Sequence, residues 1–336
     1  MTTISRRINI LLFALLATLS ANAQSRSGDA YEFLDLPTTS RSTALGGQQA
    51  VLGVGEAGFF FQNPAALNDT LSGSISLNVT PLPGSITYGS ASYVHHFEKL
   101  GTFALGVQYI NYGSFDWTDE DENDLGTFKA QEAAIYMSYA RKMTPHLTLA
   151  ATLKPIFSKL ESYGSFGLAM DMGAMYTSES RLLTAGILIR NLGAQVTKYH
   201  EDGEHESLNT DMRIGITYKP EYAPFRFSLT MKDIFHWDLS TDRENSIDWG
   251  DNLMRHLVWG LEIIPIRNFF VGFGYNQRVR KELRSSGAGG MAGFSWGFGL
   301  RILKIDIAYG MRRYHLAGSA NSISVSTNLN RFIKSN

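Results

Sequence analysis

The stretch GFSWGFGLRILKIDIAYG, residues 293–310, alternates strictly between two kinds of side chain. Successive side chains of an extended chain point to opposite faces. Large apolar residues share one face, namely Phe294, Trp296, Phe298, Leu300 and Ile302. Small or charged residues share the other, namely Ser295, Gly297, Gly299 and Arg301. After Leu303 the alternation resumes in a new phase, with Ile305, Ile307, Tyr309 and Met311 opposite Lys304, Asp306, Ala308 and Arg312. The pattern predicts two strands whose apolar face needs a second protein layer or lipid.

The composition narrows the class of protein. The 336 residues carry 30 basic and 31 acidic side chains, so no strong polyanion or nucleic-acid partner is implied. The chain has no cysteine, which excludes disulfides and thiol chemistry. The 32 glycines and the aromatic share of 12% favour twisted β-structure with aromatic girdles over a helical bundle.

The N-terminus has the features of a secretory signal peptide. Arg6 and Arg7 precede the apolar run 8–19, and small residues follow in an A-x-A arrangement that ends at Ala23. We expect cleavage between Ala23 and Gln24, which removes residues 1–23. The alternative, an N-terminal membrane anchor, is disfavoured because the run is too short to span a bilayer. No cysteine follows the run, so a lipoprotein anchor is excluded.

From about residue 72 onward, alternating runs predict about 14 strands. These runs are 72–80, 86–97, 101–113, 127–142, 147–159, 166–178, 182–194, 211–219, 225–236, 256–265, 269–278, 291–302, 303–315 and 320–329. The faces opposite the apolar ones carry many small residues and also polar ones, namely Gln108, Asp171, Arg190, Arg213, Lys232, Glu262, Arg301 and Asp306. Such charges either line a permeation path or pair with one another across an interior, and pairing is favoured because buried charges need partners.

The connections between these runs alternate in length. Short ones (FEKL, KMTPH, SESR, PEYAP, PIRN and a tight turn at 302–303) alternate with long polar ones, of which the longest are near 113–126, 195–211, 236–256 and 278–290. This layout is typical of outer-membrane barrels. We therefore expect an all-β fold, a transmembrane antiparallel barrel over 72–336, with both termini periplasmic and the long loops extracellular. A soluble β-sandwich or propeller is the less favoured alternative, since no blade repeat is present.

Residues 24–71 do not alternate like the rest. Their apolar part, YEFLDLPTTSRSTALGGQQAVLGVGEAGFFFQNPAAL at 31–67, is rich in Gly and Ala and precedes the first strand. A barrel of about 14 strands is too wide to fill with its own strand side chains. We expect this segment to enter the lumen as a hatch, with Asn63-Pro64 forming a turn near its end.

The same residues carry a resemblance to a known family. The Asn63, Pro64, Ala65 element resembles the NPA element that closes a luminal hatch in barrels related to the FadL fatty-acid channels. More narrowly, YEFLDLPTTSRSTALGG (31–47) followed by NPAAL is similar to the PorQ family of the type IX secretion system. The likeness covers nearly the whole mature chain in length and strand layout, and the first 40 or so residues are its sharply diagnostic part.

The resemblance implies a non-enzymatic outer-membrane anchor without cofactors. It would hold the surface protein PorZ near PorU and PorV, in a complex that attaches cargo to anionic lipopolysaccharide. The alternative is a FadL-like transporter of long-chain fatty acids or hydrocarbons. A lipid-modifying enzyme is the least favoured hypothesis, because no nucleophile with a base and an orienting group emerges. Candidate partner-binding positions in the long loops are Asp119, Asp121, Glu201, Glu204, Trp249, Arg280 and Arg284.

Four short motifs resemble functional sites without meeting their requirements. GFSWG matches G-x-S-x-G, but Ser295 lies in mid-strand rather than at a strand-to-helix turn. GVGEAG at 53–58 is followed by FFFQNP rather than by a long helix. The acidic run from Asp119 lacks the Gly and Glu of an EF-hand loop, and HEDGEH at 200–205 has metalloprotease-like residues at the wrong spacing. We therefore expect no catalytic, cofactor or metal site.

Overall fold

The computed structural model describes residues 30–53, 55–118, 124–199, 203, 205–240, 247–285, 291–315 and 318–332. The predicted signal peptide and its cleavage pair, Ala23 and Gln24, lie outside the described residues.

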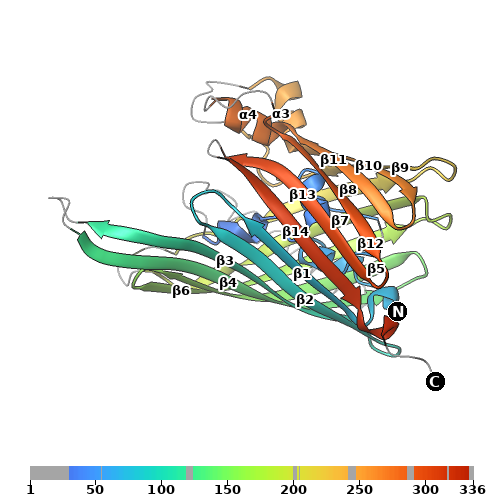
Figure 1. The fold of residues 1–336 in the computed structure, drawn as a ribbon, viewed down its shortest axis with the longest axis horizontal. Coiled ribbons are helices and arrows are strands. Elements are labelled where there is room, and N and C mark those ends of the chain that lie inside the picture. The colour runs from blue at the N-terminus through green and yellow to red at the C-terminus, as the bar shows by residue number, and fades with distance from the viewer. Residues whose placement is uncertain are drawn as a thin grey trace, which may run out of the picture.

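Fourteen antiparallel strands form one closed barrel within the described part of the chain (Figure 1). Each strand pairs with its neighbours in sequence, and β1 pairs with β14 to close the ring. The strands are β1 (Ser74–Pro81), β2 (Thr87–Phe97), β3 (Gly101–Thr118), β4 (Asp124–Lys142), β5 (Leu147–Leu160), β6 (Tyr163–Thr177), β7 (Leu183–Thr197), β8 (Asp211–Tyr218), β9 (Phe225–Met231), β10 (Leu257–Ile266), β11 (Phe269–Asn276), β12 (Phe294–Ile302), β13 (Ile305–His315) and β14 (Gly318–Asn328). The predicted barrel and its strand number are confirmed.

The change of phase at Leu303 is a two-residue turn. β12 and β13 pair directly on either side of it, with Ile302 opposite Ile305. Leu303 has φ of 55°, in the left-handed region that tight hairpin turns require. The apolar residues of both strands therefore return to the same outer face, where Phe294, Phe298 and Ile307 are exposed.

The short connections lie where the sequence placed them, but the opposite end of the barrel differs from the prediction in two ways. The expected loop near 113–126 is largely strand, because β3 and β4 continue through it. Two other expected loops contain helices, α3 (Trp249–His256) and α4 (Gln277–Ser285), which lie together above the barrel rim (Figure 1). Both polar stretches have the amphipathic spacing of a helix. Connections at this end are also not all long, since 82–86 and 161–162 are brief turns.

The outer wall is apolar around the barrel. Its exposed side chains include Leu77, Leu105, Val107, Phe157, Ile187, Ile216, Phe227, Trp259, Phe273, Phe298 and Val325. An outward apolar belt on a closed sheet is what a hydrocarbon environment requires, because closure leaves no unpaired strand edge. Within the described residues, no helix is both long enough and apolar enough to cross a membrane.

Residues 30–71, here called the luminal segment, lie inside the barrel. Its short helices are η1 (Glu32–Asp35), α2 (Ser40–Ala44), η2 (Ala57–Phe61), η3 (Pro64–Ala66) and η4 (Asp69–Leu71), and a further turn, η5 (Leu329–Arg331), follows the last strand. Thr39 caps α2 by accepting a hydrogen bond from the Ser42 amide. Glycines of the wall let the segment approach closely: a Cβ at Gly310 would lie 2.1 Å from the Ser40 carbonyl oxygen. The wide lumen is thus filled by the chain's own N-terminal part.

Candidate functional site: the clasped luminal segment

The Asn63, Pro64, Ala65 element lies buried and holds two parts of the luminal segment together. The Asn63 side chain accepts a hydrogen bond from the Ala65 amide at 2.9 Å and donates one to the Ala50 carbonyl at 2.7 Å. Pro64 begins η3, where a missing N–H costs nothing. A Cβ at Gly173 of β6 would lie 2.6 Å from the Asn63 side-chain oxygen, so this element packs directly against the wall. Its part in opening or closing a hatch stays a prediction.

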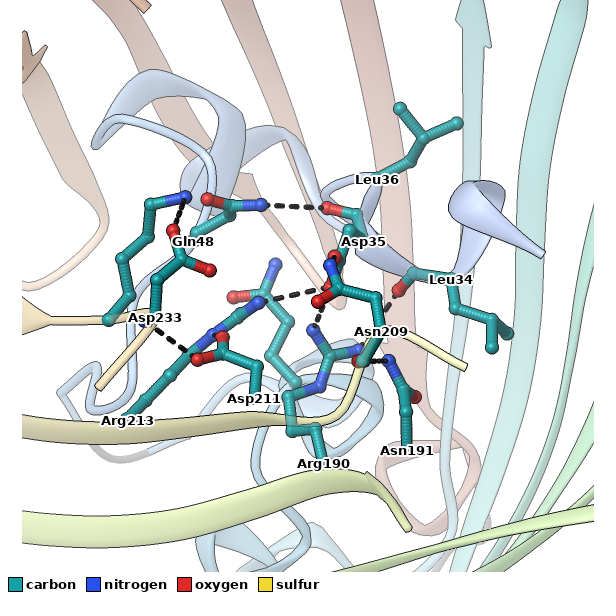
Figure 2. Close-up of polar contacts among 12 residues, drawn as sticks. Leu34, Asp35, Leu36, Gln48, Arg190, Asn191, Asn209, Asp211, Arg213 and Asp233 are labelled. Atoms are coloured by element: carbon teal, nitrogen blue, oxygen red, sulfur yellow. Dashed lines mark hydrogen bonds and ion pairs between the residues drawn. The ribbon is translucent and has the colours of Figure 1, made fainter. Parts of the chain in front are cut away.

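Asp35 fastens one side of the luminal segment to strands β7 and β8 (Figure 2). One of its carboxylate oxygens lies 3.0 Å from the Arg190 guanidinium and 3.0 Å from that of Arg213. The other oxygen accepts from the Asn209 amide at 2.7 Å, and Arg190 also donates to the Leu34 carbonyl at 2.9 Å. Burial raises the pKa of Asp35, but Arg213 and then Arg190 outweigh it and hold this pKa below its ordinary value.

The same network continues out of the lumen to α4. Arg213 also pairs with Asp211, whose other oxygen accepts from the Asp233 amide at 2.7 Å. Asp233 in turn lies 3.0 Å from Lys232 and 2.5 Å from Arg278 of α4. Burial raises the pKa of Asp233, and Lys232 and Arg278 more than offset it, so the pKa is lowered. Ion pairs, joined by one backbone hydrogen bond between Asp233 and Asp211, therefore connect the luminal segment to α4 above the rim.

The two helices are tied to each other by charge. Asp251 of α3 lies 2.9 Å from Arg255 in its own helix and 3.0 Å from Lys281 of α4. The His256 ring stacks on Trp237 with ring centres 4.7 Å apart. Together these contacts make α3 and α4 one small surface element rather than two independent loops.

A second buried pair lies deeper in the wall. Lys154 of β5 and Asp171 of β6 are both almost fully buried, and their charged atoms are 2.6 Å apart. The Asp171 carboxylate also accepts from the Asn191 amide at 2.8 Å. Unpaired charges here would be costly, so the pair fixes this part of the wall.

At the short-turn end, Arg41 of α2 binds Glu262 of β10, with the closest atoms 2.6 Å apart. Arg226 shares the same carboxylate at 3.2 Å, and Glu56 lies 3.7 Å from Arg41. One Glu56 oxygen has no hydrogen-bond partner, and burial raises the Glu56 pKa more than Arg41 lowers it. A cavity of about 220 Å³ opens beside these groups, lined by both charged side chains and apolar ones such as Phe270.

Hydroxyl groups fasten the segment at the seam between β1 and β14. The Ser40 amide donates to the Ser324 hydroxyl at 2.8 Å, and the Ser40 hydroxyl donates to Ser322 at 3.1 Å. Asn78 of β1 accepts from both Ser322 and Ser324, at 2.7 and 2.8 Å. The luminal segment is thus bonded to both strands that close the barrel.

The structure places the other predicted residues as follows. Of the predicted luminal charges, Asp171, Arg190, Arg213, Lys232 and Glu262 are buried and paired. Arg301 and Asp306 pair with each other at the rim of the cavity and are more exposed. Sequence reasoning missed the decisive partners Asp35, Arg41, Lys154, Asp211 and Asp233. Inward position on a strand could have found Lys154 and Asp211, whereas nothing local distinguishes Asp35.

The candidate partner-binding positions are only partly described. Trp249 begins α3 and is 67% exposed, and the Arg280 guanidinium of α4 lies over the Phe294 ring at 6.0 Å. Arg284 belongs to α4. Asp119, Asp121, Glu201 and Glu204 lie outside the described residues.

The misleading motifs have structural roles where they are described. The Ser295 hydroxyl donates to the Ala44 carbonyl at 2.9 Å, so it fastens α2 to β12 and does not sit at a nucleophile turn. GVGEAG leads into the buried turn η2 rather than a long helix. Across the part of the chain that the structure describes, no cluster of three or more His, Cys, Asp or Glu side chains could hold a metal.

Solved structures with a similar fold include a toluene transporter, a hydrocarbon channel and a FadL homologue. The toluene transporter TodX of P. putida is 12% identical over 88% of this chain and 99% of TodX, with a TM-score of 0.55. The monoaromatic hydrocarbon channel CymD is 14% identical over 88% of this chain and 97% of CymD, with a TM-score of 0.51. A FadL homologue of Pseudomonas aeruginosa is 11% identical over 90% of this chain and all of that chain, with a TM-score of 0.50.

The fold is that of FadL-type barrels. At these identities the likeness extends to the fold alone. No protein-family model matches the chain. No curated protein matches it either.

Proposed function

We propose that this protein is a plugged, non-enzymatic outer-membrane anchor that holds a partner protein at the cell surface. The observation that carries the proposal is the luminal segment, which is fastened on several sides by buried ion pairs and hydroxyl contacts. Breaking such a pair by removing one partner costs about 3–5 kcal/mol. A lumen closed in this way suits a scaffold, and the helices joined to it by charge give the scaffold a surface element.

The narrower proposal is an anchor of the type IX secretion system. It rests on the resemblance of residues 31–47 and of Asn63, Pro64 and Ala65 to the PorQ family. In this proposal the barrel holds PorZ directly, near PorU and PorV, with termini in the periplasm and the α3–α4 end outside. Outer-membrane lipid and lipopolysaccharide surround it, and the barrel itself performs no chemistry.

A second candidate is transport of a hydrophobic molecule, and the similar fold of TodX and CymD favours it. A fatty-acid carrier needs an apolar cavity of about 300–1,000 Å³. The cavity of about 220 Å³ beside Arg41 is smaller and has a mixed lining. Transport would therefore require the luminal segment to move and the Asp35 and Arg41 contacts to break.

Crosslinking in intact cells separates the two functions. We would place an affinity tag within 286–290, crosslink, extract the outer membrane in mild detergent and identify what co-purifies by mass. The anchor function predicts a stoichiometric surface protein together with lipopolysaccharide-handling partners. Recovery of the barrel alone with bound fatty acid would rule out the anchor.

A liposome assay tests transport directly. Purified barrel in liposomes should admit no more labelled fatty acid or toluene than empty liposomes do. Uptake that saturates with concentration would support the transporter instead.

A further inference from the structure

Strands β3 and β4 extend beyond every neighbour as a two-stranded ribbon (Figure 1). Pairing of β3 with β2 ends at Asn111, and pairing of β4 with β5 ends at Ala130. Beyond these points, residues 114–118 and 124–128, here called the ribbon, have no second strand beside them in the described ladder. A lone hairpin of this kind is only marginally stable in water, and its two edges can each accept another strand.

The ribbon also stands clear of the membrane. A barrel strand needs about 9–11 residues to cross the hydrocarbon layer. On β3 residues 101–111 supply that length, with Phe103, Leu105, Val107 and Tyr109 as its outward apolar residues. The ribbon begins after them, at the same end of the barrel as α3 and α4 (Figure 1).

A bulge at the base of the ribbon changes which face carries the aromatic residues of β3. Between Asn111 and Ser114 the register shifts by one extra residue on β3, and Gly113 has φ of 90°. Below the bulge, the aromatic residues Phe103 and Tyr109 of β3 lie on the exposed outer face, and the luminal face carries Thr102, Ala104, Gly106, Gln108 and Ile110. Above it, Phe115 and Trp117 lie on that luminal face, opposite Phe128 and Gly126.

The reversed face is an exposed aromatic cluster. Phe115 and Phe128 stack with ring centres 5.2 Å apart, and Phe115 and Trp117 are 42% and 50% exposed. An aromatic girdle would turn toward lipid, whereas this cluster shares the side of the ribbon that continues the inner wall. Exposed aromatic residues of this kind dominate the energetics of protein interfaces.

The charge of the ribbon indicates what kind of molecule would cover its aromatic face. Residues 114–129 contain six acidic residues and one basic residue, Lys129, which lies opposite Ser114; four of the acidic residues, at 119–122, lie outside the described residues. A lipid layer would not cover an acidic strand pair above the membrane. A second copy in the same membrane would meet the outer wall, not the face that continues the lumen. The long-loop sequences 200–202, 241–246 and 286–290 (HED, TDRENS and SGAGG) supply no large apolar side chain, and the connection 316–317 supplies a single one, Leu316.

We propose that the ribbon is a docking site for a surface partner protein, which adds a basic strand to its open edge and covers Phe115 and Trp117. This inference rests on the proposed anchor function and names the surface by which the anchor acts. Main-chain pairing would supply the attachment, and the aromatic face and acidic charge would select the partner.

Photocrosslinking at single positions tests the inference. Benzoylphenylalanine would replace Phe115, Trp117 or Trp249 in cells, and Tyr222, which is 94% exposed at the opposite end, would be the control. We expect the same partner protein crosslinked at 115 and 117 but not at 222. The crosslinked partner peptide should be rich in Lys or Arg.

Companion variants measure the contribution of the aromatic face. Phe115→Ser with Trp117→Ser should lower partner recovery about tenfold or more, corresponding to at least about 1.4 kcal/mol. Asp116→Lys should lower it less and make the remaining binding less sensitive to salt. Tyr222→Ser should change nothing. Heat-modifiable migration in gels checks that each barrel is closed.

The outcomes separate this inference from the anchor function. A partner crosslinked at 249 but not at 115 or 117 would overturn the ribbon as docking site and leave the anchor standing. No protein adduct at any position would overturn both. Adducts at 115 and 117 that contain only lipid, or a second copy of this chain, would overturn the inference as well.

Discussion

The luminal segment is attached differently to two parts of the barrel wall, β2–β6 and β7–β10, here called the apolar half and the charged half. Against β2–β6 it packs by apolar contact, with Phe33, Phe60, Phe61, Leu67 and Leu71 in one buried cluster with wall residues such as Tyr136. Against β7–β10 it makes smaller apolar contacts and neutral hydrogen bonds, and buried ion pairs are added through Asp35 and Arg41. Packing weakens gradually as contacts are lost, whereas a buried charge left alone is costly at once. The apolar half therefore resembles an ordinary protein core. In the charged half, a change of protonation or the loss of one charge would release the luminal segment.

Two reporters can follow the halves separately, because the chain has no cysteine of its own. Ser92 of β2 and Ser228 of β9 are both buried, and neither hydroxyl has a hydrogen-bond partner. Ser92→Cys and Ser228→Cys therefore remove no hydrogen bond. Maleimide labelling of the thiol introduced at each position measures how often that half of the lumen opens.

The largest expected effect is on the apolar half. Phe61 stacks on Phe60 at 4.4 Å and meets the Tyr136 ring edge-on at 4.8 Å. Phe61→Ala should destabilise the packed segment by about 3–5 kcal/mol. Labelling of the thiol at position 92 should rise by two orders of magnitude or more, and labelling of the thiol at position 228 should rise by less. Phe61→Leu, which leaves a smaller void, is the matched control, and equal labelling in the two variants would contradict the packing explanation.

Next comes the charged half. Asp35→Asn keeps the shape of the side chain but leaves Arg190 and Arg213 with one carboxylate fewer, which should cost about 3 kcal/mol. Here labelling at position 228 should rise more than labelling at position 92. Glu32→Gln, an exposed change in the same short helix η1, should leave both labelling rates unchanged. The comparison of the two halves fails if Asp35→Asn opens both equally.

The two ends of the charged half should respond to pH in opposite directions. The lowered pKa of Asp35 gives stability that is present above its unfolded pKa of about 3.9 and is lost as pH falls below it. The raised pKa of Glu56 gives stability that is present below about 4.3 and is lost as pH rises through the folded pKa. Hydrogen exchange of the segment between pH 3 and 8, corrected for intrinsic rates, measures both.

Variants assign each arm of that profile. Asp35→Asn should remove the loss at low pH, and Glu56→Gln should remove the loss toward neutral pH. A profile that neither variant changes would show that other groups control the segment.

The smallest effect should come from a pair outside the fastening. Asp69 and Lys142 lie 3.2 Å apart, but each side chain is 51% exposed. Exposed pairs contribute about 0–1 kcal/mol. Asp69→Asn should therefore change neither labelling rate measurably, and the buried pair at Asp35 gains its importance from burial rather than from charge alone.

The sequence predicted the barrel well because alternation is a local property. The period of two at 293–310 holds in both strands, and its change of phase coincides with the turn at Leu303. The prediction from alternation failed at Gly113, where one extra residue exchanges the inner and outer faces of β3. A bulge cannot be recognised from the order of apolar and polar residues alone. The region was instead predicted as a loop.

The partners of the fastening could not be predicted in the same way. Asp35 meets Arg190 across 155 positions of sequence and Arg213 across 178. Hydrophobic periodicity fixes which face a strand residue takes, but not which residue of another segment it meets. The sequence therefore predicted that inward charges would pair with one another. It did not predict that Asp35 would be the partner of both Arg190 and Arg213.

The hydroxyl cluster at the seam has a consequence for assembly. Asn78 and Ser324 are 246 positions apart, on the first and last strands, and both belong to the group that binds Ser40. The ring can close only after its final strand has been made, and such distant contacts form late because loop closure must precede them. A segment bonded to both sides of the seam is best placed if it is already there when the seam forms. A Ser40 already in the lumen would offer hydrogen-bond partners to both edges of the sheet as they find their register.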